Sequence, residues 1–196
     1  MVNRKPRTVM YSRKRENKTN YLKRLKLLLS RKGRLVVRFT NKRVIAQLVE
    51  FTPKGDKVLV GVDSSVLRKS GWQYSCKNLP AAYLTGFLLG KKVAEKKYKG
   101  EMVFDTGFKS PLHKGKYYAF LKGVLDAGVN VLHSGKDLFP DDKKIQGAHI
   151  QDYAGKMKGA HNEHNKVQFA QYLKSNAAPE SISSAFAQVK QKLMKA

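Results

Sequence analysis

The sequence predicts an α/β domain: a mixed sheet with three leading strands and packed helices, a basic N-terminal arm and a helical C-terminal extension. Three strand-like segments lie within residues 34–62, and helical and strand-like segments then alternate up to residue 133. The chain has 196 residues, 41% of them hydrophobic, which is enough to bury a core. We expect three parts: an arm with an amphipathic helix (1–33), an α/β core (34–134) and an extension with amphipathic helices (135–196).

The first part combines an irregular arm with one helix. Residues 1–18 hold Pro6 and scattered cations without a helical period, so this arm is expected to become ordered only on a phosphate backbone. Residues 19–33 predict a helix capped by Thr19 or Asn20. Its apolar stripe consists of Leu22, Leu25, Leu28 and Leu29, whereas Lys23, Arg24 and Lys26 lie off the stripe and face either water or phosphate.

Residues 34–49, RLVVRFTNKRVIAQLV, predict a β-hairpin with Asn41 and Lys42 at the turn, where asparagine tolerates a positive φ. Because side chains alternate along a strand, one face is apolar and the other carries the arginines. The apolar face holds Leu35, Val37, Phe39, Val44, Ala46 and Leu48; the outer face holds Arg34, Val36, Arg38 and Thr40 opposite Val49, Gln47, Ile45 and Arg43. Such an outer face suits nucleic acid, with arginine merely facing water as the alternative.

The third strand and the first long helix follow. Pro53, Gly55 and Asp56 mark a turn, and KVLVGV at 57–62 predicts a strand that is apolar on both sides and therefore central. A helix is predicted within residues 78–100, capped by Asn78, and its Gly86 and Gly90 would let it lie close to the sheet.

The remaining segments continue the alternation. EMVFD at 101–105 predicts a strand, residues 114–128 a second amphipathic helix, and 129–133 one more short strand. From about residue 135 the chain is more polar and shows little helical regularity before residue 165. Residues 181–195 have apolar side chains at helical spacing and predict a docking helix.

The charge distribution points to a polyanionic partner. The net charge is +26, and residues 1–43 hold 16 basic side chains and one acidic one, Glu16. A surface this positive is typical of nucleic-acid binding and less often of anionic membranes; a solvated, solubilising tail is the alternative. Aromatic side chains near these cations could stack on bases or pack in the core: Tyr11, Tyr21, Trp72 and Tyr74.

The composition also indicates a compartment. Cys76 is the single cysteine, which fits a reducing cytosol. No apolar run approaches the ~20 residues of a membrane span, and the basic N-terminus lacks the apolar middle of a signal peptide. We expect a cytoplasmic protein without a membrane partner.

Three motifs could carry chemistry. FDTG at 104–107 matches the aspartic-protease signature, but no second copy exists to pair with Asp105. Asp63 and Asp105 at strand ends could hold two metal ions, so a metal-dependent, ribonuclease-H-like nuclease is the enzymatic alternative, although such sites need three or four acids. HNEH at 161–164, with His149 upstream, would need a further zinc ligand. We expect no catalytic residues, metal or cofactor.

Four segments in order resemble a known family. SRKRENKTNYLKRLKLLLSRKGRLVVRFTNKRVIAQLV, NLPAAYLTGFLLGKK, VFDTGFKSPLHKGKYYAFLKGVLDAGVNVLHS and IQGAHIQDY are similar to the archaeal and eukaryotic form of the large-subunit ribosomal protein L-eighteen family. The similarity covers roughly residues 4–175. It implies a non-enzymatic constituent of the large ribosomal subunit that binds 5S rRNA and helps anchor it in the central protuberance. It also implies a ribonuclease-H-like topology without the active site.

The implied partners are 5S rRNA, large-subunit rRNA and neighbouring ribosomal proteins of the central protuberance. The predicted RNA-binding residues are the arm cations and the outer face and turn of the hairpin: Arg4, Lys5, Arg7, Arg13, Lys14, Arg15, Arg34, Arg38, Thr40, Asn41, Arg43 and Gln47. Replacing Arg34, Arg38 and Arg43 with alanine is expected to weaken 5S rRNA binding and leave the fold intact.

Overall fold

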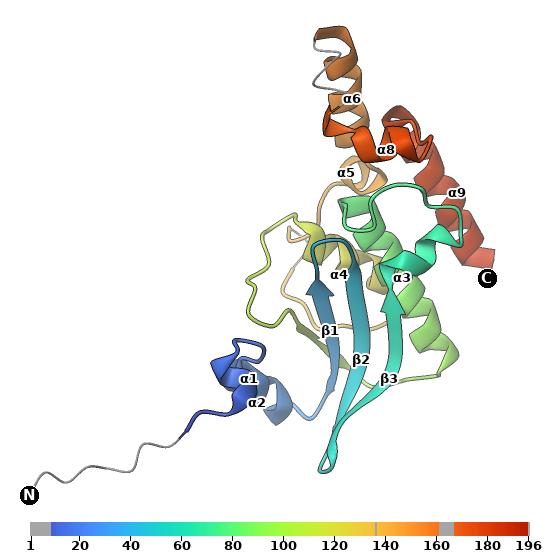
Figure 1. Ribbon diagram of the computed structural model, residues 1–196. Coiled ribbons are helices and arrows are strands. Elements are labelled where there is room, and N and C mark those ends of the chain that lie inside the picture. Colours follow the sequence, from blue (N-terminus) through green and yellow to red (C-terminus); the bar gives the residue numbers. More distant parts are fainter. Residues whose placement is uncertain (1–8, 136, 161–166, 196) are drawn as a thin grey trace, which may run out of the picture.

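A computed structural model describes residues 9–135, 137–160 and 167–195 of the chain. Its centre is a four-stranded sheet in the order β3-β2-β1-β4 (Figure 1). The strands are β1 (Gly33–Phe39), β2 (Val44–Thr52), β3 (Gly55–Asp63) and β4 (Met102–Asp105). β1, β2 and β3 are successively antiparallel, whereas β4 is parallel to β1. The predicted α/β fold with a mixed sheet and packed helices is therefore confirmed.

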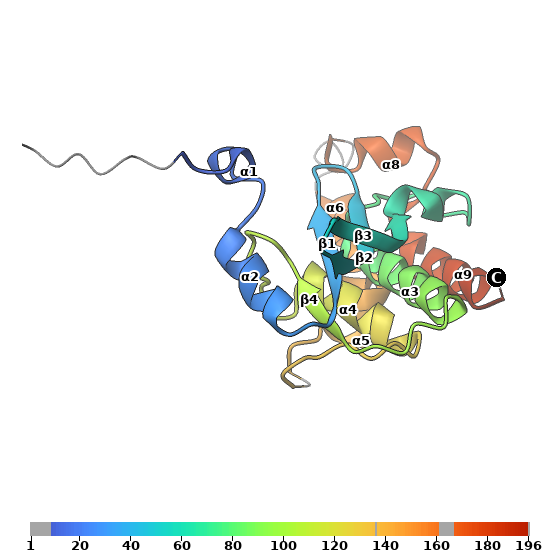
Figure 2. The same ribbon diagram turned by 90° about the horizontal axis from the view of Figure 1, so that it is seen from below.

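Helices lie on both sides of this sheet. On one side are α3 (Leu79–Glu95) and α4 (Lys116–Asp126); on the other is α2 (Tyr21–Leu29), preceded by the single turn α1 (Ser12–Arg15). Figure 2 shows the strands between α2 and the α3–α4 pair. Asn78 caps α3 as predicted, because its side chain accepts a 2.8 Å hydrogen bond from the Ala81 amide. The main core joins the sheet to α3 and α4 through residues that include Leu35, Val37, Leu48, Phe120 and Val124.

Glycines set the spacing of α3 and α4 rather than that of α3 and the sheet. A Cβ atom at Gly86 would lie 2.1 Å from the Phe120 carbonyl oxygen, and one at Gly123 would lie 2.2 Å from the Tyr83 carbonyl oxygen. A Cβ atom cannot come that close to a backbone oxygen unless the two helices move apart, so the observed spacing requires glycine at both positions. The expectation that Gly86 and Gly90 bring the helix to the sheet is wrong about the neighbour, which is α4: Gly90 faces Val124 and Ala127.

The hairpin has the predicted register but a different turn. Phe39 pairs with Val44, Val37 with Ala46 and Leu35 with Leu48, and five of these six side chains are fully buried. The Thr40 amide donates to the Arg43 carbonyl, and the Thr40 Oγ1 contacts both the amide and the carbonyl of Arg43 at 2.9 Å. Asn41 does not adopt a positive φ. The threonine side chain therefore closes the turn, which removes the need for a left-handed residue.

β3 lies at an edge of the sheet, so its predicted central position is wrong. Val60 and Val62 are buried, but Val58 is 50% exposed. Leu48 pairs with Val60 and Val49 with Val58, which leaves Leu59 as an extra residue in a β-bulge. A bulge reverses the alternation beyond it, so Val58 and Asp56 point to the outer face of the sheet.

A second core joins the C-terminal segments to α3. The segments are α5 (Asp142–Gln146), α6 (Ala148–Ala160), α8 (Ala170–Lys174), η2 (Pro179–Ser181) and α9 (Ile182–Lys195). The predicted stripe of α9 is confirmed, since Ile182, Phe186, Val189 and Leu193 are buried in this cluster with Trp72 of the loop after η1 (Ser64–Arg68). Sequence periodicity missed α5 and α6. The short strand predicted at 129–133 is reduced to one bridge between Val131 and Met102.

Candidate nucleic-acid interface

The helix α2 is docked with its polar side on the sheet. Its cap is Asn20, whose side chain accepts a 3.0 Å hydrogen bond from the Lys23 amide, as one of the two predicted caps. Three of the four leucines of the predicted apolar stripe are exposed, Leu22 by 77%, Leu25 by 58% and Leu29 by 74%, and the fourth, Leu28, is only half-buried. The expected orientation of this helix is therefore wrong, and so is the expectation that Lys23 and Arg24 face water or phosphate.

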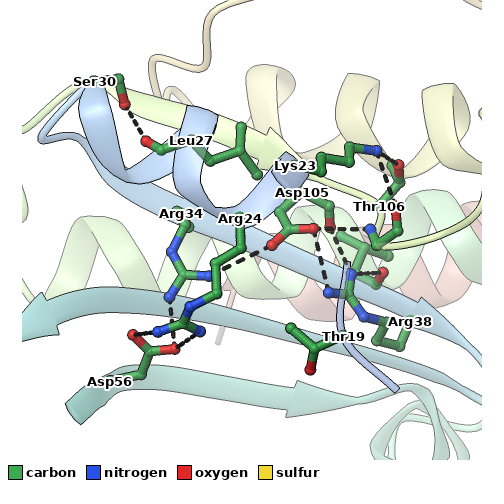
Figure 3. A network of polar contacts seen from close by, with 12 residues as sticks. Thr19, Lys23, Arg24, Leu27, Ser30, Arg34, Arg38, Asp56, Asp105 and Thr106 are labelled. Carbon is green, nitrogen blue, oxygen red and sulfur yellow. Dashed lines mark hydrogen bonds and ion pairs between the residues drawn. The ribbon is translucent and has the colours of Figure 1, made fainter. Parts of the chain in front are cut away.

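Ion pairs and hydrogen bonds explain this orientation (Figure 3). The Lys23 Nζ donates to the Thr106 hydroxyl and to the Gly107 carbonyl, both at 3.0 Å. The Arg24 guanidinium donates two parallel hydrogen bonds to the Asp56 carboxylate, at 2.6 and 2.9 Å. A paired, planar contact of this kind is among the stronger polar interactions in proteins. It ties α2 to the outer face of β3.

Arg34 lies at the centre of this network. It starts the outer face of β1 and is only 3% exposed. Its Nη2 lies 2.7 Å from Asp56 Oδ2 and its Nη1 lies 3.5 Å from Asp105 Oδ2. Within the described part of the chain, its Nε and Nη2 have no aligned hydrogen-bond acceptor. Arg34 is therefore a buried cation held by charge between two carboxylates.

Arg38 occupies the outer part of the same network. Its Nη1 donates to the carbonyls of Val37 and Asp105 at 2.8 Å, and its Nη2 donates to the Asp105 carboxylate at 3.2 Å. Its side chain remains 44% exposed, so one side of the guanidinium is open to a further partner. Asp105 also accepts a 2.8 Å hydrogen bond from the Gly107 amide, which closes the turn after β4.

The electrostatics at Asp56 follow from these contacts. Burial would raise the pKa of Asp56, but the hydrogen bonds from Arg24 and the positive charges of Arg24 and Arg34 outweigh it and lower the pKa below the ordinary value of 3.8. The carboxylate is thus ionised at neutral pH and stabilises the docked arrangement of α2.

A groove runs between α2 and the outer face of the sheet. It has a volume of about 330 Å³. Its lining includes six cationic side chains, Arg13, Lys18, Lys23, Arg24, Arg34 and Arg38, and two carboxylates, Asp56 and Asp105. Val36 and Gln47 form part of its floor. The two carboxylates leave an excess of positive charge, so the groove attracts anions.

Of the other predicted binding residues that the structure describes, Arg13 and Gln47 also line this groove, and the rest lie on α1 and at the hairpin turn. Arg13, Lys14 and Arg15 in α1 are exposed, and Arg13 donates a 2.9 Å hydrogen bond to the Thr19 hydroxyl. Arg43 is paired with Asp63 at 3.1 Å and its side chain is 55% exposed. Asn41 is exposed at the hairpin turn, Thr40 closes that turn and Gln47 is half-buried. Arg4, Lys5 and Arg7 lie outside the described residues.

The catalytic alternatives find no support in this geometry. Asp63 and Asp105 lie on the two outer strands, about 14 Å apart at ~4.8 Å per strand spacing, whereas two-metal sites hold their ions ~4 Å apart. Asp105 is instead the partner of Arg34 and Arg38, and Asp126 accepts a 2.6 Å hydrogen bond from the Tyr83 hydroxyl. Across the described ranges, no three His, Cys, Asp or Glu side chains gather as a metal site. His161 and His164 are outside those ranges.

The aromatic candidates divide between core and surface. Trp72 and Tyr74 are buried in the second core, and the Tyr74 hydroxyl donates to the Ala178 carbonyl at 2.7 Å. Tyr11 is 72% exposed and its ring lies 5.2 Å from that of Tyr21. The stacking interpretation therefore applies to Tyr11 and Tyr21 alone among these four.

Sequence reasoning missed the two carboxylates that organise the site. Asp56 was interpreted as a turn residue, and Asp105 as the end of a strand. Strand alternation alone places Asp56 on the core side, and only the bulge at Leu59 brings it to Arg34. For Asp105, the missing information was the pairing of β4 with β1. The two strands are parallel with Val36 opposite Asp105, which brings Asp105 beside the arginines of β1.

The comparisons with known proteins are consistent with a basic surface that binds nucleic acid. Among the described residues, no helix is long and apolar enough to cross a membrane. The family model described as "Ribosomal large subunit proteins 60S L5, and 50S L18" matches residues 6–103.

Two curated relatives are similar over nearly the whole chain, and both are named large ribosomal subunit protein uL18. The protein of Korarchaeum cryptofilum is 45% identical over 186 residues, which cover 94% of this chain and 93% of the relative. The protein of Thermofilum pendens is 42% identical over 188 residues, 96% of this chain and 95% of the relative. The chain therefore belongs to the family of the large-subunit ribosomal proteins 60S L5 and 50S L18.

Proposed function

We propose that this protein is a structural constituent of the large ribosomal subunit that binds 5S rRNA and helps to anchor it in the central protuberance, in contact with large-subunit rRNA and neighbouring proteins. Membership of the family supports the ribosomal part of this proposal. The observation that carries the RNA-binding part is the row of exposed cations that runs from α1 along the mouth of the positively charged groove. We expect the protein to act in the cytoplasm on the ribosome, without catalysis.

The contacts divide the basic residues into two groups. Arg13, Lys14 and Arg15 are exposed, and no carboxylate of the described residues pairs with them, so an RNA phosphate meets no internal competitor there. Arg34 is buried and already held by Asp56 and Asp105. We assign phosphate contacts to the first group and a structural position to Arg34.

Arg38 and Arg43 are intermediate cases. Each is paired with one carboxylate and still exposes about half of its side chain. Since a guanidinium has five donors in a planar fork, each can keep its internal partner and still bind a phosphate. We therefore retain both as RNA contacts, Arg38 in the groove and Arg43 at the hairpin turn.

The test is binding of the full chain to a 5S rRNA transcript with transfer RNA as competitor, measured over a range of salt concentrations. The variant replaces Arg13, Lys14 and Arg15 with glutamine. If each of the three neutralises a phosphate, the slope of log affinity against log salt becomes shallower by about 2 to 3. Circular dichroism should show an unchanged fold, because these side chains are exposed and outside the core.

A matched control removes the same charge elsewhere. Lys174, Lys192 and Lys195 lie exposed on α8 and α9, at the opposite end of the molecule from α1 in Figure 1. Their replacement with glutamine should leave the affinity and the slope nearly unchanged. Equal losses in both variants would mean that net charge alone drives binding and that the proposed contacts are wrong.

We also propose a ribonuclease-H-like topology for the core. The strand order β3-β2-β1-β4, with only β4 parallel to its neighbour, supports it. The parallel bridge between Met102 and Val131 lies where a fifth strand would join. The acids that such nucleases need at one point of the sheet are absent among the described residues, which fits a shared topology without a shared activity.

A further inference from the structure

A second cavity lies on the other side of the β1 tip from the basic groove. Its volume is about 460 Å³, within the ~300–1,000 Å³ typical of ligand sites. Four segments line it: the end of β1, the start of α3 with the residues before it, the loop between β4 and α4, and the start of α4. The apolar lining comes from Phe39, Leu79, Leu112 and Tyr117.

The walls of this cavity are aromatic and partly open. The rings of Phe39 and Tyr117 meet edge to face with centroids 4.6 Å apart, and both side chains are half-buried. Leu112 is 80% exposed at the rim, so its side chain is available for contact with a ligand. A flat, apolar group that enters here would contact two rings and one aliphatic side chain.

Three lysines, Lys77, Lys109 and Lys116, complete the lining. In the described ranges, none of the three forms an ion pair with a carboxylate. Burial, followed by the nearby charge of Lys77, lowers the pKa of Lys116, so the two amines lie close enough to repel each other. The cavity thus concentrates positive charge without an internal counter-ion.

We infer that this cavity receives one unstacked nucleotide of the bound RNA, with its base against Phe39, Leu112 and Tyr117 and its phosphate on Lys109 and Lys116. The inference deepens the proposed RNA-binding function and rests on it. Single-stranded RNA is commonly recognised in this manner, through bases turned out onto aromatic side chains while cations hold the backbone.

Charge and shape together favour a nucleotide over other ligands. A free inorganic anion would leave the apolar walls unused, and an uncharged apolar ligand would leave three lysines unpaired. A nucleotide would contact the apolar walls with its base and the lysines with its phosphate. The cavity also lies at the carboxyl ends of the parallel strands β1 and β4, where loops diverge and ligands bind in many α/β folds. An RNA that occupies the groove at Arg38 is within reach, because Arg38 lines the groove and the next residue of β1, Phe39, lines the cavity.

The first test uses a mononucleotide and the full chain. Adenosine 5′-monophosphate is titrated into ¹⁵N-labelled protein and the amide shifts are followed by NMR, with adenosine, inorganic phosphate and glutamyl-phenylalanine as comparison probes. We expect saturable shifts in residues 109–117, with adenosine and phosphate each binding at least about tenfold more weakly because each lacks one half of the recognised group. Tighter binding of the acidic peptide would overturn the inference and indicate a protein partner.

Variants localise the effect. Replacement of Lys109 and Lys116 with glutamine should weaken the mononucleotide at least about fivefold, whereas the same change at Lys192 and Lys195 should not. Leu112→Ala removes apolar surface without changing charge, and it should weaken the nucleotide but leave phosphate binding as it is. No saturable shift near Tyr117, or equal losses in both lysine variants, would overturn the inference.

The second test separates this site from the proposed function. Ultraviolet crosslinking of the full chain to a 5S rRNA transcript should yield a nucleotide adduct on the peptide that contains Tyr117, and the Lys109/Lys116 variant should lose it. If the transcript binds through α1 without any such adduct, the pocket inference is wrong and the proposed function stands. If the transcript does not bind while the mononucleotide does, the 5S rRNA proposal fails and the pocket remains.

Discussion

Replacement of Arg34 with alanine should destabilise the protein rather than simply weaken RNA binding. The change removes a cation that is 3% exposed. It also leaves the negative charge of Asp105, whose side chain is 8% exposed, with one positive partner fewer. Removing one partner of a buried ion pair typically costs ~3–5 kcal/mol. Asp105 keeps Arg38 and the Gly107 amide, and Asp56 keeps Arg24. We therefore expect the lower end, about 3 kcal/mol.

The assay is urea unfolding followed by circular dichroism, together with a thermal scan. For a chain of this size, about 3 kcal/mol corresponds to a fall in Tm of roughly 6–12 °C. Arg43→Ala is the matched control, because it removes a guanidinium from a pair whose side chains are 55% and 28% exposed. Such an exposed pair contributes only ~0–1 kcal/mol. Equal unfolding midpoints for Arg34→Ala and the parent would refute the buried network.

The same prediction revises the expectation from sequence that alanine at Arg34, Arg38 and Arg43 leaves the fold intact. A triple variant would combine a stability defect with a lost RNA contact, and binding data alone could not separate the two. Arg43→Ala alone should reduce 5S rRNA affinity at an unchanged unfolding midpoint. Arg34→Ala should reduce the affinity only as far as it reduces the folded fraction.

Three further changes test other parts of the structure by urea unfolding. The pKa of Asp56 is lower in the folded protein than the unfolded value of 3.8, so the carboxylate stabilises the fold above pH 3.8 and this stabilisation is lost as the pH falls through the folded pKa. The difference in unfolding free energy between the parent and Asp56→Asn should therefore be constant above pH ~5, shrink below pH 3.8 and vanish in strong acid. Leu25→Gln should change stability by less than ~0.5 kcal/mol, since Leu25 is 58% exposed; a loss typical of core leucines would contradict the orientation of α2. Gly86→Ala should lower the unfolding free energy by at least ~1–3 kcal/mol, because the new Cβ would lie 2.1 Å from the Phe120 carbonyl oxygen. Gly155→Ala is the control: it has open space around it and should stabilise α6 by up to ~1 kcal/mol.

Local rules predicted the parts of the fold that depend on near neighbours in the chain. Alternation along residues 34–49 gave the correct hairpin register and the correct split between its faces. The caps at Asn20 and Asn78 were identified from residue type and position. The four strands and the helices α2, α3, α4 and α9 were expected within a few residues. Each of these features is determined within one strand pair or one helix.

The errors arose where a distant segment decides the outcome. An edge position for β3 depends on the strand order, which alternation within β3 does not encode. A single extra residue, Leu59, reverses the faces of the strand and brings Asp56 to Arg34. The hairpin turn differs for a different reason. A positive φ at Asn41 was expected to close it, but the Thr40 hydroxyl closes it through hydrogen bonds with the backbone of Arg43.

The orientation of α2 shows how the charged site shaped the fold. An amphipathic helix normally buries its leucines, and burial of three such side chains would be worth several kcal/mol, at ~1.5–3 kcal/mol each. Yet the surface offered to α2 is the outer face of the sheet, where Arg34, Asp56 and Asp105 lie. Leucines placed there would leave these groups without water or partners, at a larger cost. Lys23 and Arg24 instead complete the charge pairing, and the leucines remain in solvent.

This docking has a consequence for RNA binding that the sequence pattern alone would not suggest. Asp56 and Asp105 neutralise the inner cations, so the positive potential that remains belongs to side chains at the mouth of the groove and on α1. Phosphates approaching the protein are therefore attracted to its exposed rim rather than to the arginine closest to the core. The predicted arginine-rich face is real as geometry, but its innermost arginine stabilises the fold, and the outer arginines are the ones that we propose as contacts for nucleic acid.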